Sequence, residues 1–131
     1  MTEQSLSQRF HALESHIAAE KGAFAFFALF LREDAPDRWD LIVAAPWIGS
    51  DEQAAVDYFV DQIKARLGAQ NLISLSRIIV ADPHHLAVQA LNREIQVEHG
   101  EIEIRDRTLF GQPVKRAIII TSKLAPAPAA A

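Results

Sequence analysis

The stretch Trp39-Asp40-Leu41-Ile42-Val43-Ala44-Ala45-Pro46-Trp47 decides the fold. It is short, apolar on both alternating sides and closed by a proline, as expected of a strand that is covered on both faces. A capped helical pattern follows directly over residues 50–67, and a second apolar strand follows at 76–81. Strand, helix and strand in this order predict a parallel pair joined by a right-handed crossover.

The residues before this unit predict one helix and one strand. Over residues 5–21 apolar side chains recur at helical spacing, whereas His11, Glu14 and Ser15 fall off that stripe and are expected in solvent. Residues 23–32 carry large apolar groups at both alternating sets of positions. They predict a strand that is buried on both faces and pairs antiparallel with residues 39–45.

The residues after the unit predict a helix and a final hairpin. Asp82-Pro83 suits the N-cap and first position of a helix that runs to about Ile95. Residues 101–105 and 114–122 predict two strands, with a loop over 106–113. The predicted fold class is α/β (α+β mixed): a single mixed, mostly five-stranded sheet with about three helices, in the order α-β-β-α-β-α-β-β. One globular domain is expected over residues 1–123, with an Ala/Pro-rich disordered tail over 124–131.

Composition excludes several classes of function. Thirteen Lys and Arg against 17 Asp and Glu give a net charge of −4, so no binding to nucleic acid or to a membrane surface is expected. Cysteine is absent, which excludes disulfides, thiol catalysis and thiolate metal sites. No signal-peptide pattern is seen, and the longest apolar run is about half of the roughly 20 residues that a membrane helix needs. A cytoplasmic location is expected.

The best candidate site follows from the topology. The carboxyl ends of two parallel strands lie at the same edge of a sheet, where helix N-termini offer free amides and partial positive charge. In an enzyme or anion binder, His85 would be the acid or base, Asp82 its orienter or a metal ligand, and Ser50 an anion holder. The candidate ligand-binding residues at this edge are Trp47, Ser50, Asp82, His84 and His85.

Each of these residues also has a purely structural interpretation. Asp82 suits a helix cap, Trp47 can cover the end of the sheet, and His84 shares the helical stripe of the buried face. Adjacent histidines on a helix do not point at one metal ion, so neither a metal nor a cofactor is predicted. No phosphate loop, nucleophile elbow or His-Glu-x-x-His motif occurs, and the catalytic residues of any enzyme remain unknown.

Two other groups of charged residues are alternative candidates for a site. Glu14 and Asp40 resemble the carboxylates with which nucleases hold a divalent ion, but no Glu-x-Lys sequence accompanies them. The acids Glu98, Glu101 and Glu103, and the basic residues around the final hairpin, are typical of a solvated face.

The sequence therefore favours a small non-catalytic interaction or regulatory domain that binds a protein partner, most simply another copy of itself as a homodimer. An unpaired edge strand, at 101–105 or 114–122, would extend the sheet across a two-fold axis. The alternative is an enzyme or small-ligand (anion) binder that uses the carboxyl edge of strands 39–45 and 76–81.

Overall fold

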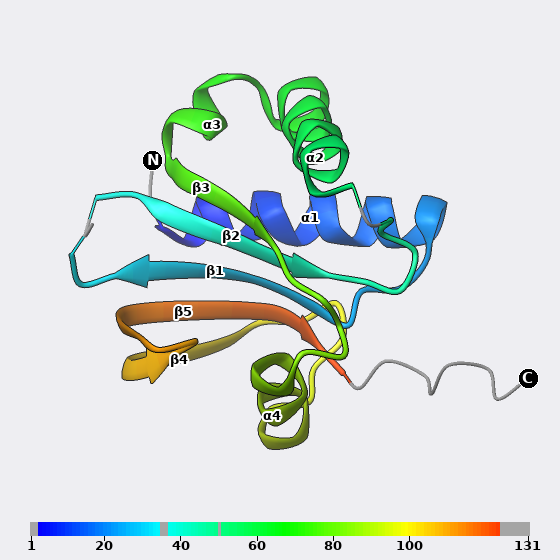
Figure 1. Cartoon of the computed structure of the whole chain (residues 1–131). Coiled ribbons are helices and arrows are strands. Elements are labelled where there is room, and N and C mark those ends of the chain that lie inside the picture. Colours follow the sequence, from blue (N-terminus) through cyan, green and yellow to red (C-terminus); the bar gives the residue numbers. More distant parts are fainter. Residues whose placement is uncertain (1–2, 35–36, 50, 124–131) are drawn as a thin grey trace, which may run out of the picture.

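The computed structural model describes residues 3–34, 37–49 and 51–123 (Figure 1). Ser50 and the predicted tail over 124–131 lie outside this part of the chain. The predicted fold class is confirmed: one mixed five-stranded sheet is combined with helices in the expected order, with one short helix added. The elements are α1 (Glu3–Lys21), β1 (Phe26–Arg32), β2 (Trp39–Ala44), α2 (Glu52–Leu67), α3 (Gln70–Ile73), β3 (Leu75–Val80), α4 (Leu86–Glu94), β4 (Ile102–Leu109) and β5 (Gln112–Ser122).

The strands follow the order β3-β2-β1-β5-β4 across the sheet. The pair β2–β3 is parallel, which confirms the predicted strand–helix–strand unit, and every other pair is antiparallel. β1 occupies the centre, and β3 and β4 are the two edges. The prediction of an edge strand at 114–122 is therefore wrong, because β5 lies between β1 and β4. The other predicted segment, 101–105, does fall on the edge strand β4.

Helices cover both faces of the sheet. α1 and α2 lie on one face, called here the two-helix face, and α4 lies on the other, called the α4 face (Figure 1). Successive residues of β1 alternate between them: Phe27 and Leu29 join the core under α1 and α2, whereas Phe26 and Phe30 join the core under α4. The prediction that this strand is buried on both sides is confirmed.

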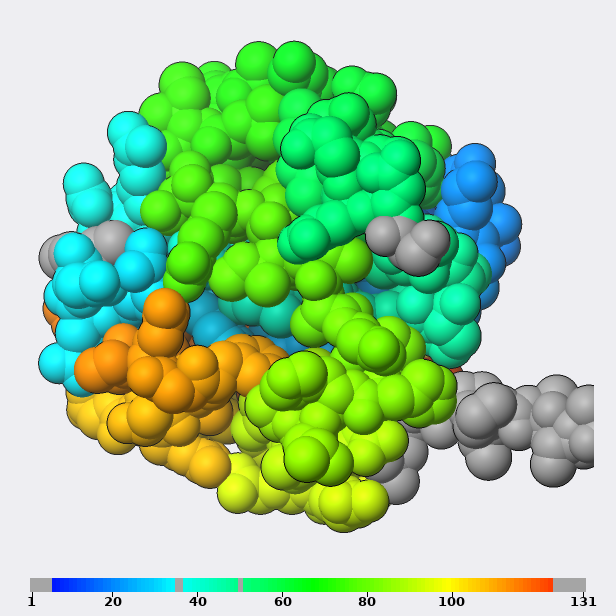
Figure 2. Space-filling view, viewed as in Figure 1, coloured from blue at the N-terminus to red at the C-terminus, as the bar shows by residue number. Residues whose placement is uncertain are grey.

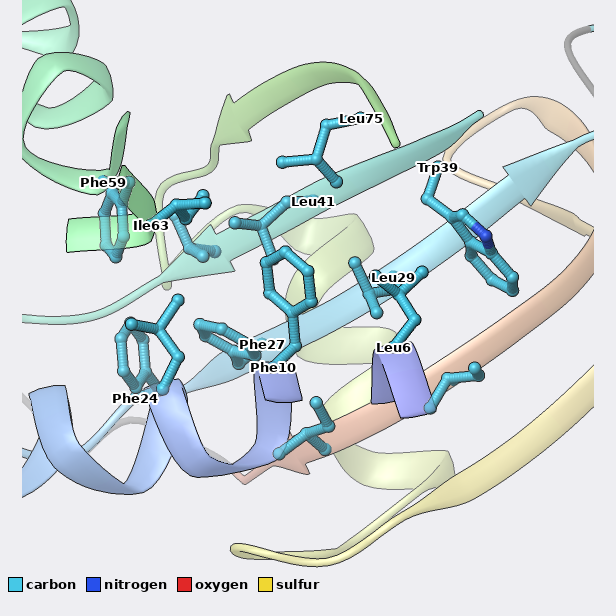
Figure 3. Packing of buried hydrophobic residues seen from close by; sticks show 14 of the residues in the cluster. Leu6, Phe10, Phe24, Phe27, Leu29, Trp39, Leu41, Phe59, Ile63 and Leu75 are labelled. Atoms are coloured by element: carbon cyan, nitrogen blue, oxygen red, sulfur yellow. The ribbon is translucent and has the colours of Figure 1, made fainter. Parts of the chain in front are cut away.

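The apolar stripe of α1 seals the two-helix face. Its four predicted members are all buried, and they pack on strand residues such as Phe27, Leu29 and Leu41 (Figure 3). α2 adds Phe59 and Ile63, which are fully buried beside them. The members of the α1 stripe are Leu6, Phe10, Leu13 and Ile17.

Two helix starts differ from expectation. α2 begins after Asp51, whose carboxylate accepts a hydrogen bond from the Ala54 amide at 3.0 Å. α4 begins only at Leu86, capped by His85, so the predicted start at Asp82 is wrong. Asp82 accepts instead from the His84 amide at 2.8 Å, within a turn. The error has a physical reason, because Asp-Pro suits a tight turn as well as a helix N-terminus.

The last two predicted strands are longer than expected. The predicted loop over 106–113 is largely strand, and the chain reverses at Phe110 and Gly111, which have φ angles of 52° and 76°. This turn places Phe110 on the α4 face, stacked on Phe30 with ring centroids 5.7 Å apart. The predicted strand over 76–81 is observed as β3, and residues 70–73 before it form the added helix α3.

Candidate functional site

Trp47 is held where β2 leaves the sheet. Its indole Nε1 donates a hydrogen bond of 2.8 Å to the carbonyl of Gly22, at the end of α1. Gly22 has a φ of 122°, and a Cβ added there would lie 3.1 Å from Trp47 Cδ1, so this position requires glycine. The indole is therefore fixed by backbone on one side and by aromatic rings on the other.

Three aromatic side chains surround Trp47 on the two-helix face. The ring centroids of Phe24, Tyr58 and Phe59 lie 5.4, 6.3 and 6.3 Å from that of Trp47. The contacts to Phe24 and Tyr58 are edge-on, a favourable arrangement for aromatic pairs. This packing joins the end of α1 to the middle of α2.

A pocket of about 280 Å³ opens to solvent beside this cluster. The ammonium of Lys21 lies 5.5 Å from the centre of the Tyr58 ring. The Tyr58 hydroxyl is buried and has no hydrogen-bond partner among the described residues. Burial raises the pKa of this hydroxyl, and the nearby Glu20 raises it further. The pocket is lined by, among others, Lys21, Trp47, Asp51, Ala54, Ala55 and Tyr58.

The other described candidate residues lie elsewhere. Asp82, His84 and His85 are exposed and precede α4, which covers the opposite face, and none of them lines the Trp47 pocket. The reason is topological: the chain leaves β2 toward the two-helix face and leaves β3 toward the α4 face (Figure 1). Although β2 and β3 are parallel, the residues that follow them therefore do not form one site.

Glu14 forms a polar cluster that the sequence did not reveal. The expectation that it lies in solvent is wrong, because Glu14 is completely buried. Thr121 Oγ donates to one carboxylate oxygen at 2.6 Å, and His99 Nδ1 lies 2.7 Å from the other. The amide of His99 also donates to Thr121 Oγ at 3.1 Å. One signal was available: Glu14 lies four residues after Phe10 and thus on nearly the same side of α1.

His99 adopts a left-handed backbone conformation, with a φ of 52°, and its side chain is 42% exposed. A carboxylate that orients a histidine is common in catalytic and metal sites. Here, however, the Trp47 pocket does not include His99, nor does a pocket of about 310 Å³ at the end of β5. Within the described residues, no group of three or more His, Asp or Glu side chains is arranged to hold a metal ion. The hydrogen bonds of this cluster therefore connect α1, β5 and the segment before β4, which is a structural role.

Asp40 is the second buried acid. Its Oδ2 accepts hydrogen bonds from Arg32 at 2.9 Å and from Arg77 at 3.0 Å, while Oδ1 has no partner among the described residues. Asp40 is paired in register with Phe30 and so points to the α4 face. Glu14 approaches the sheet from the two-helix face. The two carboxylates thus lie on opposite faces, and they do not form the shared ion site of the nuclease hypothesis.

Comparison of the chain with protein-family models, with curated proteins and with solved structures gave no match. Among the described residues, no helix combines the length and the apolar character needed to cross a membrane.

Proposed function

We propose that this chain is a non-catalytic interaction domain that pairs with a second copy of itself through the edge strand β3. The observation that carries the proposal is the apolar character of this edge. Ile78, Ile79 and Val80 follow one another along β3, and each is only partly buried. Edge strands of monomeric proteins are normally protected from pairing by charged residues, prolines or a covering segment.

The residues flanking β3 extend this apolar edge. Ile73, at the end of α3 just before the strand, is 69% exposed, and Leu86, at the start of α4 after it, is 79% exposed. Among the described residues, these are the exposed large hydrophobic side chains. A single exposed leucine is ordinary, but two that bracket an open strand support a contact surface.

The backbone of β3 offers free hydrogen-bonding groups. The amide of Ala81 donates to the Val43 carbonyl of β2 at 2.8 Å. Alternate residues of a strand point their backbone groups to opposite sides, so those of Ile78 and Val80 point away from the sheet. No other segment covers the outer side of β3 in the space-filling view (Figure 2). A further strand can therefore add to the sheet here.

Charge and register favour an antiparallel second copy. Arg77 and Asp82 lie at opposite ends of the edge, so antiparallel pairing places unlike charges together and parallel pairing places like charges together. Ser76 is bulged relative to β2 and Pro83 has no amide proton, which limits regular pairing to the residues between them. Centring the pair on Ile79 matches Ile78 with Val80 of the second copy, and brings the Ile73 end of one copy to the Leu86 end of the other.

A cytoplasmic location is part of the proposal. The absence of cysteine from 131 residues supports it, because a reducing compartment provides no oxidative route to disulfide bonds.

Sedimentation velocity from low to high micromolar concentration tests the pairing. We expect a monomer–dimer equilibrium that Ile73→Lys combined with Leu86→Lys shifts to monomer, because both side chains are exposed and their loss leaves the core intact. Ala65→Lys combined with Thr108→Lys adds the same charge at exposed positions away from β3 and is expected to keep the dimer. A wild-type chain that stays monomeric throughout the range would contradict the proposal.

A further inference from the structure

We infer that the pocket beside Trp47 binds a small aromatic carboxylate. The inference is independent of pairing through β3, because the pocket lies at the junction of α1, β2 and α2.

The pocket has the size and the walls for one aromatic ring system. Its volume of about 280 Å³ is close to the lower limit of typical ligand sites, roughly 300 Å³. Trp47 and Tyr58 supply aromatic surface, while Ala54 and Ala55 leave open the space that larger residues of α2 would fill. A Cβ added at Gly49 would meet no atom within 4 Å, so this side is open as well.

The packing of the fold holds the aromatic walls of the pocket in place. The hydrogen bond from Trp47 to Gly22 and the edge-on contact with Tyr58 fix the indole. A site whose walls are ordered in advance loses little conformational entropy when it binds. A flat ring can therefore enter without rearrangement of the aromatic cluster.

The charges of the pocket favour an anion. Lys21 contacts the Tyr58 ring but no carboxylate within ion-pair distance among the described residues, so its charge is available to a ligand. Asp51, the carboxylate of the lining, is occupied as the cap of α2. The start of α2 adds a partial positive charge at the same wall. A cationic ligand would instead compete with Lys21 for the face of Tyr58.

NMR titration tests the inference with three indole probes that differ in charge: indole-3-acetate, neutral 3-methylindole and cationic tryptamine. We expect saturable shifts of the Trp47 indole N–H with indole-3-acetate, and about fivefold weaker binding of 3-methylindole, which is the size of one exposed ion pair. Trp39 is the internal reference, because this residue is buried and does not line the pocket. Tryptamine is expected to bind most weakly.

Two kinds of variant test separately the shape of the pocket and the charge of Lys21. Ala54→Leu fills the pocket at an exposed position and is expected to abolish the Trp47 shifts, and Ala55→Leu serves as a second filling variant should the first disturb the fold. Lys21→Gln is expected to remove the preference for the acid, whereas Lys64→Gln, which removes the same charge from an exposed site on α2, leaves it unchanged. Binding that survives both filling variants, or an acid preference that survives Lys21→Gln, would overturn the inference. So would the absence of any Trp47 shift with indole-3-acetate.

Discussion

The two edges of the sheet differ in how they meet solvent. β4 carries alternating charged residues on its exposed side, including Glu103, Arg105 and Arg107, whereas β3 carries a run of three partly exposed aliphatic residues. Charges of this kind prevent a strand from pairing with another chain. The contrast indicates that one edge is protected from association and the other is left open to it.

Hydrogen bonding explains how the difference arises. On β4, Glu103 accepts from Arg105 at 3.0 Å and from Arg116 of β5 at 2.6 Å, and the side chains of Glu103 and Arg105 stay at the surface. β3 also has a charged residue, but Arg77 is directed onto buried Asp40 and onto Gln112, at 3.0 and 2.8 Å. Arg77, whose side chain is 41% exposed, thereby also anchors β3 to the fold.

A single introduced cysteine gives the largest expected difference between the edges. The chain has no cysteine of its own, so Ile79→Cys and Arg105→Cys each create one thiol. At the centre of the proposed pair, the two copies of residue 79 form a non-hydrogen-bonded pair with Cα atoms about 4.5 Å apart, within disulfide range. We expect mild oxidation to link most of the Ile79→Cys protein and little of the Arg105→Cys protein, as measured by non-reducing gel electrophoresis. Equal disulfide linkage of the two variants would contradict the proposed difference between the edges β3 and β4.

The anchoring of the two edges is compared by removing one carboxylate charge from each. Asp40→Asn leaves two guanidinium groups without their buried counter-charge, and we expect a loss of about 2–4 kcal/mol of stability. Glu103→Gln removes a partly exposed carboxylate, and its expected cost is about 0.5 kcal/mol or less. Urea unfolding measures both values. Similar losses of stability in the two variants would contradict the claim that the pairing of Arg77 with buried Asp40 anchors β3.

The attachment of β4 to the rest of the fold is tested at His99. His99→Ala leaves buried Glu14 with one fewer hydrogen-bond partner, and the expected loss of stability is about 1–3 kcal/mol. His84→Ala is the matched control, because that histidine is exposed and its side chain has no hydrogen bond to the residues that the structure describes. Thermal unfolding followed by circular dichroism compares the two. A destabilisation as small as that of the control would contradict a structural role for the cluster.

The smallest expected effect concerns one surface pair, between Arg107 of β4 and Glu94 of α4. A hydrogen bond from Arg107 holds the pKa of Glu94 below its ordinary value of 4.5. Because the folded pKa is the lower one, the contribution of this pair to stability is present above the ordinary pKa and is lost as pH falls through the folded pKa. We expect Arg107→Ala to return the Glu94 titration to the ordinary range, as followed by carboxyl NMR, with little change at neutral pH in the proposed pairing through β3. An unchanged Glu94 titration would rule out the pairing.

The sequence predicted most of the architecture because local patterns determine it. The strand from Trp39, the stripe of α1 and the crossover through α2 all follow from periodicity and capping residues. Boundaries were less accurate where one motif suits two structures. Asp82-Pro83 fits a turn as well as a helix start, and Gly111 fits a loop as well as a two-residue reversal.

The candidate site was only partly predictable. Trp47 does line a pocket, but the sequence could not show that α2 and α4 start on opposite faces, which separates Trp47 from His85. Glu14 was assigned to solvent because a lone acid off an apolar stripe is usually exposed. Its partners His99 and Thr121 are about a hundred residues away, and only the tertiary fold brings them to it.

The central position of β1 has a consequence for how the protein is made. β1 pairs with β2, which follows at once, and with β5, which is completed at Ser122. Until the ribosome has released that last strand, β1 is itself an unpaired apolar edge, and pairings so distant in sequence form slowly. We expect chains that stop before Gln112 to be cut within β1 in limited proteolysis, whereas the full chain resists. The vulnerable edge of the nascent protein is thus a strand that the finished protein buries almost completely.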